Sequence, residues 1–169
     1  MDFFELIKNR YSVRAYKSTP VEEKKIQKVL EAACLAPTAC NLQPFRLIVI
    51  KSRGREADLK RIYKAEWLSS APIVICACSL SAKAWSRMDG KNYCDVDTTI
   101  VMDHLILAAA AQGLGTCWIA AFNPTAAREI LGLPGDVEPL AFTPLGYPAD
   151  KPKLKRRKDL AELVCYESW

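Results

Sequence analysis

Four short apolar runs of strand character alternate along the chain with segments of helical periodicity. The runs cover roughly 47–50, 72–79, 116–120 and 137–145. Short apolar runs separated by helical segments are typical of a protein that mixes helices with a sheet. None of the runs approaches the ~20 apolar residues of a membrane span, and 169 residues is the usual length of one domain. We therefore expect residues 1–169 to form a single domain with no membrane segment.

One helix has a clear start signal. The sequence Thr19-Pro20-Val21-Glu22 has the capping-box pattern, with Thr19 as the N-cap and Pro20 at the first helical position. Apolar residues then recur at helical spacing, which predicts one buried stripe: Ile26, Val29, Leu30, Ala33 and Cys34. The pattern predicts a helix that starts after Thr19 and ends before Pro37.

The remaining helices are predicted from periodicity and from their terminal residues. They are a short helix opened by Asp2, a polar helix over roughly 54–64, a long apolar helix over 95–112 stopped by Gly113, and a short helix from Asn123-Pro124 to Gly132. Residues 163–169 are expected to form an extended tail.

The positive net charge of +5 is concentrated near the C-terminus. Residues 151–158 hold six of the 24 basic residues, so the other 18 face 19 acidic ones. A basic strip on a near-neutral chain is a solvated surface, a nucleic-acid patch or a specific anion site.

Cysteine and histidine usage excludes several kinds of chemistry. The seven cysteines are odd in number, no signal peptide is expected from the first residues, and we expect reduced thiols in a cytoplasmic protein. No CxxC pair occurs and His104 is the single histidine, so neither a metal site nor a Ser-His or Cys-His catalytic pair is expected. Gly113-Leu114-Gly115 lacks the third glycine of a dinucleotide fingerprint, and no Gly-Lys-Ser/Thr phosphate loop occurs.

The segment Arg10-Tyr11-Ser12-Val13-Arg14 is the first candidate site. In an extended conformation, Arg10, Ser12 and Arg14 share one face, and two forked guanidinium groups beside a hydroxyl suit a phosphate. A solvated polar turn is the alternative interpretation.

Three further clusters have residues suited to ligand contact. Residues 36–45 form a proline-fixed loop with amide and hydroxyl groups, and residues 113–122 combine small residues with a strand pattern. Gly146-Tyr147-Pro148 precedes the basic strip, in which Lys155 and Arg157 share a face if the chain is extended.

Taken in order, these four clusters resemble the nitroreductase family of small FMN-dependent NAD(P)H oxidoreductases. The similar features are Arg-x-Ser-x-Arg near the N-terminus, Ala-Pro-Thr-x-x-Asn-x-Gln-Pro-Phe, Gly-Leu-Gly-x-x-Trp-Ile, and Gly-Tyr-Pro followed by Lys-x-Arg. The resemblance covers essentially the whole chain.

The resemblance implies a set of FMN-binding residues. The phosphate would be held by Arg10, Ser12 and Arg14, joined by Lys155 and Arg157. Tyr11 is counted among the cofactor-binding residues without a role at the phosphate. The flavin would be contacted by Trp118, Ile119, Ala120 and Ala121, with the backbone of Ala120 and Ala121 facing N5, and, from the partner subunit, by Pro37, Thr38, Ala39 and Asn41. A roof over the cleft is assigned to Trp85, Arg87 and Tyr93, for which plain packing is the alternative.

The resemblance also implies a fold and a reaction. The fold would be an α+β three-layer sandwich, a central and mostly antiparallel sheet flanked by helices, assembled as a domain-swapped homodimer with two FMN at the interface. NADH or NADPH would give a hydride to flavin N5 in a ping-pong mechanism, and a nitroaromatic, a quinone or a similar small acceptor would receive it, with no catalytic side chain. The alternatives are a dehalogenase or flavin-destructase-like enzyme of the same fold and, from another class, a nucleic-acid-binding protein that uses residues 151–158.

Overall fold

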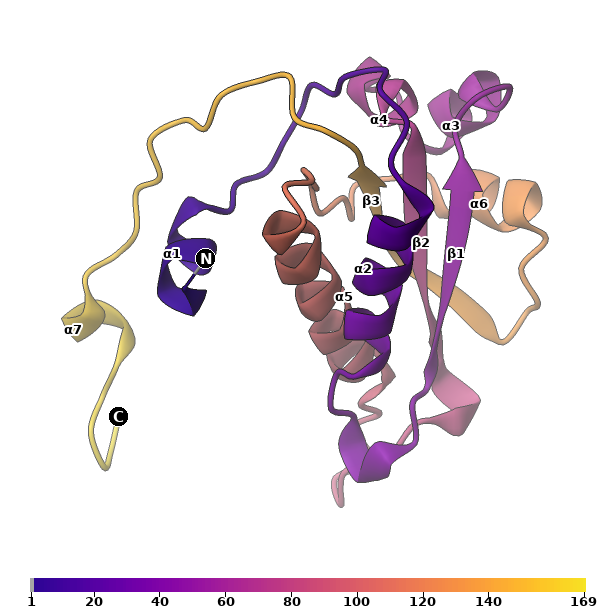
Figure 1. Cartoon of the computed structure of the whole chain (residues 1–169). Coiled ribbons are helices and arrows are strands. Elements are labelled where there is room, and N and C mark those ends of the chain that lie inside the picture. The colour runs from indigo at the N-terminus through magenta and orange to yellow at the C-terminus, as the bar shows by residue number, and fades with distance from the viewer. Residues whose placement is uncertain (1) are drawn as a thin grey trace.

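A three-stranded antiparallel sheet lies at the centre of the computed structural model, which describes residues 2–169 (Figure 1). The strands are β1 (Phe45–Lys51), β2 (Ile73–Leu80) and β3 (Val137–Leu145), in the order β1-β2-β3. The central strand β2 is almost completely buried because helices cover both of its faces.

One face of the sheet packs against two helices, α2 (Glu23–Cys34) and α5 (Cys94–Ala111). Side chains at alternate positions of β2, namely Ile73, Ile75 and Ala77, meet the two helices in the first core. The middle of α5 is fully buried at Val101, Met102 and Leu105, which makes this helix the support of that core.

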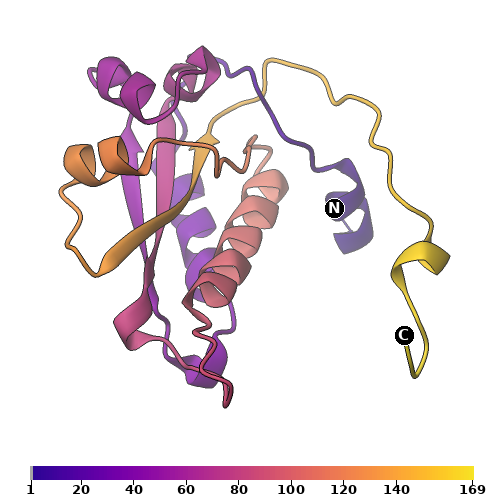
Figure 2. The ribbon, with the colours of Figure 1, turned by 180° about the vertical axis from the view of Figure 1, so that it is seen from behind.

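The opposite face packs against three shorter helices, α3 (Glu56–Ile62), α4 (Glu66–Ser70) and α6 (Pro124–Leu131), as Figure 2 shows from behind. The other alternate side chains of β2, Val74, Cys76 and Cys78, lie in this second core. The expected α+β three-layer sandwich with an antiparallel sheet is confirmed.

The two ends of the chain lie to one side of the three layers. Helix α1 (Phe3–Asn9) and the C-terminal tail with α7 (Leu160–Leu163) stand apart from the sheet in both views (Figures 1 and 2). Their apolar side chains are exposed, with Phe4 72% and Tyr166 82% accessible. Two short 3₁₀ turns, η1 (Ala39–Asn41) and η2 (Ser81–Lys83), complete the structure.

Several predicted helix ends are confirmed. The Asp2 carboxylate accepts a hydrogen bond from the Phe4 backbone at the start of α1. The Asn123 side chain caps α6, which ends at Gly132 in the left-handed conformation. Helix α5 runs as expected, and Gly113 after it has a φ of 74°.

The predicted start of α2 is wrong. The helix begins at Glu23, with Glu22 as an N-cap that makes no side-chain hydrogen bond, so Thr19 forms no capping box. The Glu22 carboxylate instead accepts a hydrogen bond from the Tyr147 hydroxyl at 2.5 Å. A capping box needs the Glu22 side chain to reach back to the backbone of Thr19. Because this side chain instead binds Tyr147, 125 positions away, the capping box does not form.

The helix predicted over roughly 54–64 is confirmed as α3, whereas α4 was not predicted. Two other expectations need correction. The extended tail expected over 163–169 begins at the last residue of α7 and forms no strand. Residues 116–120 form isolated bridges and no strand, because the Cys117 nitrogen donates to the Thr143 hydroxyl where a ladder needs a backbone carbonyl. No helix among residues 2–169 has both the length and the apolar character required to cross a bilayer.

Candidate functional site

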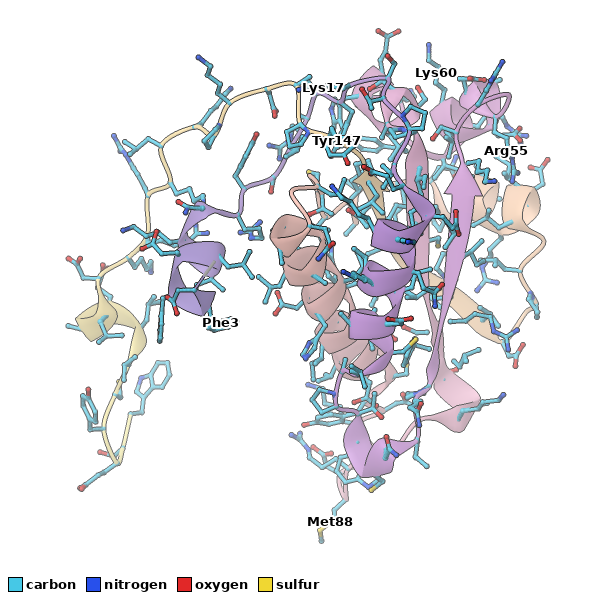
Figure 3. All side chains as sticks on the ribbon, viewed as in Figure 1. Phe3, Lys17, Arg55, Lys60, Met88 and Tyr147 are labelled. Atoms are coloured by element: carbon cyan, nitrogen blue, oxygen red, sulfur yellow. The ribbon has the colours of Figure 1, made fainter. Side chains whose placement is uncertain are left out.

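Two segments from opposite ends of the sequence run side by side beyond the sheet. The Lys17 nitrogen donates to the Tyr147 carbonyl at 2.9 Å, and the Ala149 nitrogen donates to the Ala15 carbonyl at 2.8 Å. Figure 3 shows Lys17 and Tyr147 next to each other where the two segments cross. The pairing brings residues 10–14 to the start of the basic strip.

Asp150 joins the two segments through hydrogen bonds to Tyr11 and Arg14. Its carboxylate accepts hydrogen bonds from the Arg14 backbone nitrogen at 2.8 Å and from the Tyr11 hydroxyl at 3.2 Å. The Tyr11 hydroxyl also lies 3.0 Å from the Asp150 carbonyl. Partial burial and the nearby Asp150 carboxylate raise the pKa of Tyr11, so its hydroxyl stays protonated as a donor.

A pocket of about 470 Å³ opens between the two segments. Its charged and polar lining comes from both of them: Arg10, Tyr11, Ser12, Arg14, Asp150, Lys151, Lys153, Lys155 and Arg157. Both oxygens of the Asp150 carboxylate already accept hydrogen bonds, whereas six basic side chains surround the space. The pocket is therefore suited to an anion.

Lys155 lies at the centre of this positive charge. Its Nζ donates to the backbone carbonyls of Lys8, at 2.5 Å, and of Arg10. Partial burial and the guanidinium groups of Arg10 and Arg157 lower the pKa of Lys155 from its usual value of 10.5. A phosphate beside this group would relieve the repulsion among the three cations, so the residues present fit a terminal phosphate.

The segment after α5 lies against residues 12–14. The Val13 nitrogen donates to the Thr116 carbonyl at 2.9 Å, and Ser12 and Thr116 form a parallel bridge. Gly115 has no room for a side chain, because a Cβ there would come within 2.6 Å of Val13. This close approach holds Thr116 against Ser12 and Val13, at the edge of the basic pocket.

The four candidate flavin contacts in that segment differ in solvent exposure. Ile119 is buried in the second core and uses both backbone groups to pair with Phe142. Trp118 is 37% exposed, and Ala120 and Ala121 are exposed. Only Trp118, Ala120 and Ala121 thus present surface to a ligand.

The proline-fixed loop lies at the C-terminal end of α2 (Figures 1 and 2). Pro37, Thr38, Ala39 and Asn41 follow the C-terminus of α2, whereas the segment of residues 10–14 and the basic strip lie to one side of the sandwich, next to α1. One chain therefore does not bring the loop to the basic pocket.

The three candidate roof residues cluster in a tight turn near the same loop. Trp85 and Tyr93 stack edge to face with their centroids 5.2 Å apart, and Arg87 donates to the Tyr93 hydroxyl at 3.1 Å. Arg87 also pairs with Asp89 on this turn, whose tip carries Met88 (Figure 3). The side chains thus hold one another, at the same end of the molecule as η1.

Two residues in these clusters were not predicted from the sequence. Asp150 acts through a backbone contact with Arg14, 136 positions away. Asp97 accepts a hydrogen bond from the Ala39 nitrogen, 58 positions away. The sequence offered one signal for Asp150, which is its position directly before the basic strip. No feature of the sequence indicated that Asp97 contacts the loop.

The chain was compared with known proteins. The model of the nitroreductase family matches residues 7–72 and 61–147. A solved structure of a nitroreductase family protein from Clostridium difficile 630 is 41% identical, with a TM-score of 0.90 and full coverage of both chains.

Two curated relatives are also similar. A protein of Methanothermobacter thermautotrophicus, provisionally named NADH dehydrogenase/NAD(P)H nitroreductase, is 31% identical over all of this chain and 88% of its own length. An FMN reductase [NAD(P)H] of Bacillus subtilis is 28% identical over 86% of this chain and 65% of its own. With its sandwich fold, and with the family model matching most of its length, the chain belongs to the nitroreductase family.

Proposed function

We propose that this protein is an FMN-dependent oxidoreductase that passes a hydride from NADH or NADPH to a small acceptor such as a nitroaromatic or a quinone. The observation that carries the proposal is the basic pocket, in which two distant segments gather cations around the Ser12 hydroxyl. The names of the relatives, which include NAD(P)H nitroreductase and FMN reductase, support the same class of reaction.

The phosphate end of FMN belongs in the basic pocket. Arg10, Arg14 and Arg157 offer forked donors, with Ser12 and Lys155 between them. Arg10, Arg14, Lys155 and Arg157 are assigned to one terminal phosphate, and no fingerprint for an adenylate occurs in the sequence, which favours FMN over FAD. When bound, FMN supplies the hydride chemistry at N5, and the protein supplies position, positive charge and shelter from water.

The flavin ring requires groups from a second copy of the chain. Trp118, Ala120 and Ala121 follow Thr116, which pairs with Ser12 and Val13, and all three are exposed. We assign the backbone of Ala120 and Ala121 to the side of the flavin that carries N5. Pro37, Thr38, Ala39 and Asn41 do not line the basic pocket of their own chain, and their loop follows the C-terminal end of α2. We assign them to the flavin of the partner in a homodimer. The exposed apolar arms at both termini fit such a partner.

The turn that carries Trp85, Arg87 and Tyr93 is assigned to the roof of that same cleft. Because Arg87 and the two rings hold one another, they form a preorganised edge against which a planar acceptor or a nicotinamide can stack. None of these residues is required as a proton donor. Residues 1–169 act in this proposal as one FMN-binding domain.

The cofactor is tested first. The purified protein should be yellow, and chromatography of the heat-released flavin should give FMN. FAD as the main species would contradict the assignment of FMN. A protein that neither contains nor takes up flavin would contradict the whole proposal and favour nucleic acid as the ligand of the basic strip.

The reaction is tested by steady-state kinetics with NADH and NADPH against quinones and nitroaromatics. A ping-pong mechanism predicts parallel lines in double-reciprocal plots of the rate against one substrate at several fixed concentrations of the other. The screen should include halogenated aromatics with halide release as the readout, because halide release without reduction of the other acceptors would favour a dehalogenase.

A further inference from the structure

The loop between α2 and β1 contains an unusual concentration of left-handed backbone. Cys40, Asn41 and Gln43 have φ values of 51°, 54° and 50°. They are three of the four non-glycine residues with positive φ in the part of the chain that the structure describes. Side chains disfavour this conformation, and such residues cluster where a backbone shape serves a function.

Hydrogen bonds within the loop close it on itself. The Thr38 hydroxyl accepts from the Gln43 nitrogen at 3.0 Å, and the Thr38 carbonyl accepts from the Asn41 nitrogen at 2.9 Å. These contacts fix the shape of the loop. At its far end, the Pro44 carbonyl accepts a hydrogen bond from the Leu80 nitrogen of β2 at 2.9 Å.

Asp97 ties the middle of the loop to α5. Its Oδ1 accepts a hydrogen bond from the Ala39 nitrogen at 2.9 Å, and the residue is only 2% exposed. Asp97 stands in the first turn of α5, next to Thr98, whose hydroxyl accepts from Ser79 on β2 at 3.1 Å. The loop is thereby tied through one carboxylate to the central helix and the central strand.

The same turn of α5 is joined to the roof candidates. The Asp97 nitrogen donates to the Tyr93 carbonyl at 2.9 Å. Asp97 therefore connects the loop of residues 38–43 with the turn that carries Trp85 and Tyr93.

The second carboxylate oxygen of Asp97, Oδ2, is also buried and accepts no hydrogen bond from residues 2–169. Packing alone does not require a carboxylate at a buried position, where an apolar side chain fills the same space. What the carboxylate adds here is the acceptor for the Ala39 nitrogen.

We propose that Asp97 is a positioning residue, which holds the left-handed loop of residues 38–43 in place so that Thr38, Ala39 and Asn41 reach the flavin of the partner subunit. The inference rests on the proposed FMN site. It adds a buried residue, outside the basic pocket, on which flavin affinity depends.

The test compares Asp97→Leu with Asp97→Asn in the full-length protein stripped of flavin. Leucine removes the acceptor while filling a similar volume, and asparagine keeps an oxygen for the Ala39 nitrogen. For Asp97→Leu we expect faster hydrogen exchange in a peptide covering residues 36–45 and about tenfold weaker FMN binding, because the loop is no longer held in the position that contacts the flavin. The melting temperature of the flavin-free protein should change little, since loss of the Ala39 hydrogen bond and removal of a buried carboxylate act in opposite directions. Asp97→Asn should restore slow exchange in that peptide and tighter FMN binding.

Arg14→Ala separates this inference from the proposed function. It should weaken FMN binding and leave exchange in residues 36–45 unchanged. Unchanged exchange in Asp97→Leu, or faster exchange with unchanged FMN affinity, would show that Asp97 does not position the loop for the flavin. Absence of FMN binding in the unsubstituted protein would refute the FMN site itself, while the exchange data would still report whether Asp97 holds the loop.

Discussion

The Asp150 carboxylate accepts a hydrogen bond from the backbone nitrogen of Arg14 at 2.8 Å, across 136 positions of sequence. The Tyr11 hydroxyl donates to the same residue, so Asp150 binds the N-terminal wall of the basic pocket at two points. Its negative charge also offsets part of the repulsion among the surrounding lysines and arginines. Asp150 thus holds the walls of the anion site in place, and its own carboxylate is bound to the protein.

Asp150→Ala is expected to weaken FMN binding about tenfold, because the two walls of the pocket lose their hydrogen bonds to each other. Asp150→Asn should bind FMN nearly as well as the unsubstituted protein, since the amide oxygen can still accept from the Arg14 nitrogen. Quenching of FMN fluorescence on titration measures both affinities. Equal affinity for the alanine variant would mean that the walls keep their positions without Asp150.

Arg14→Ala and Arg157→Ala are each expected to weaken FMN binding roughly tenfold to a hundredfold, the value of one hydrogen bond to a charged group. Both residues are exposed, so the melting temperature of the flavin-free protein should hardly change. Lys28→Ala, on the exposed side of α2, is a control for loss of one positive charge. If either arginine variant binds FMN like Lys28→Ala, that arginine belongs to a solvated surface.

Local sequence signals predicted the elements whose stabilising contacts are local. Helix α6 has its cap, Asn123, and its stop, Gly132, inside or next to its own segment, and both were identified. The start of α2 was missed because Tyr147 takes the Glu22 carboxylate from the far end of the chain. The strand expected over 116–120 failed for a similar reason, since the Thr143 side chain interrupts its ladder.

In the candidate site, too, features set by local spacing were predicted and features set by distant contacts were not. The shared face of Arg10, Ser12 and Arg14 was predicted from spacing, and these residues line one pocket with Lys155 and Arg157. The roles of Asp150 and Asp97 were not predicted, because each side chain contacts the backbone of a distant residue. Such contacts produce no pattern of residue types in a single sequence.

Gly115→Ala is expected to destabilise the fold by about 1–3 kcal/mol, the usual effect of overpacking. Its Cβ would come within 2.6 Å of the buried Val13 side chain and push apart the segments that carry Ser12 and Thr116. Thermal unfolding should show a drop of several degrees. Gly135→Ala, where a Cβ meets nothing within 4 Å, is the matched control, and equal melting temperatures for the two variants would contradict the tight contact.

FMN binding should depend on pH through Lys155. Burial, Arg10 and Arg157 lower the pKa of this lysine in the flavin-free protein, and a bound phosphate would raise it again. Between these two pKa values, FMN binding takes up a proton, so the affinity decreases as the pH rises through that range.

Calorimetry in two buffers of different ionisation enthalpy measures this proton uptake. The proton uptake should be larger at alkaline pH, closer to the usual lysine pKa of 10.5, than at neutral pH. Lys155→Arg keeps the charge but does not titrate in this range, so the difference between the two pH values should shrink. A difference that persists undiminished in the arginine variant would assign the uptake to another group.

FMN occupancy should fall together with dimer content on dilution. The loop of residues 38–43 follows the C-terminal end of α2 and does not line the basic pocket of its own chain, so a complete flavin site requires two subunits. The exposed phenylalanines of α1, the tail beyond α7 and the half-exposed Val96 of α5 offer the apolar surface that a partner would cover. Because each flavin would bridge two chains, separation of the subunits should release it. Sedimentation at decreasing protein concentration, followed at both protein and flavin wavelengths, measures the two quantities at once. A monomer that sediments with full flavin absorbance would show that one chain builds the whole site.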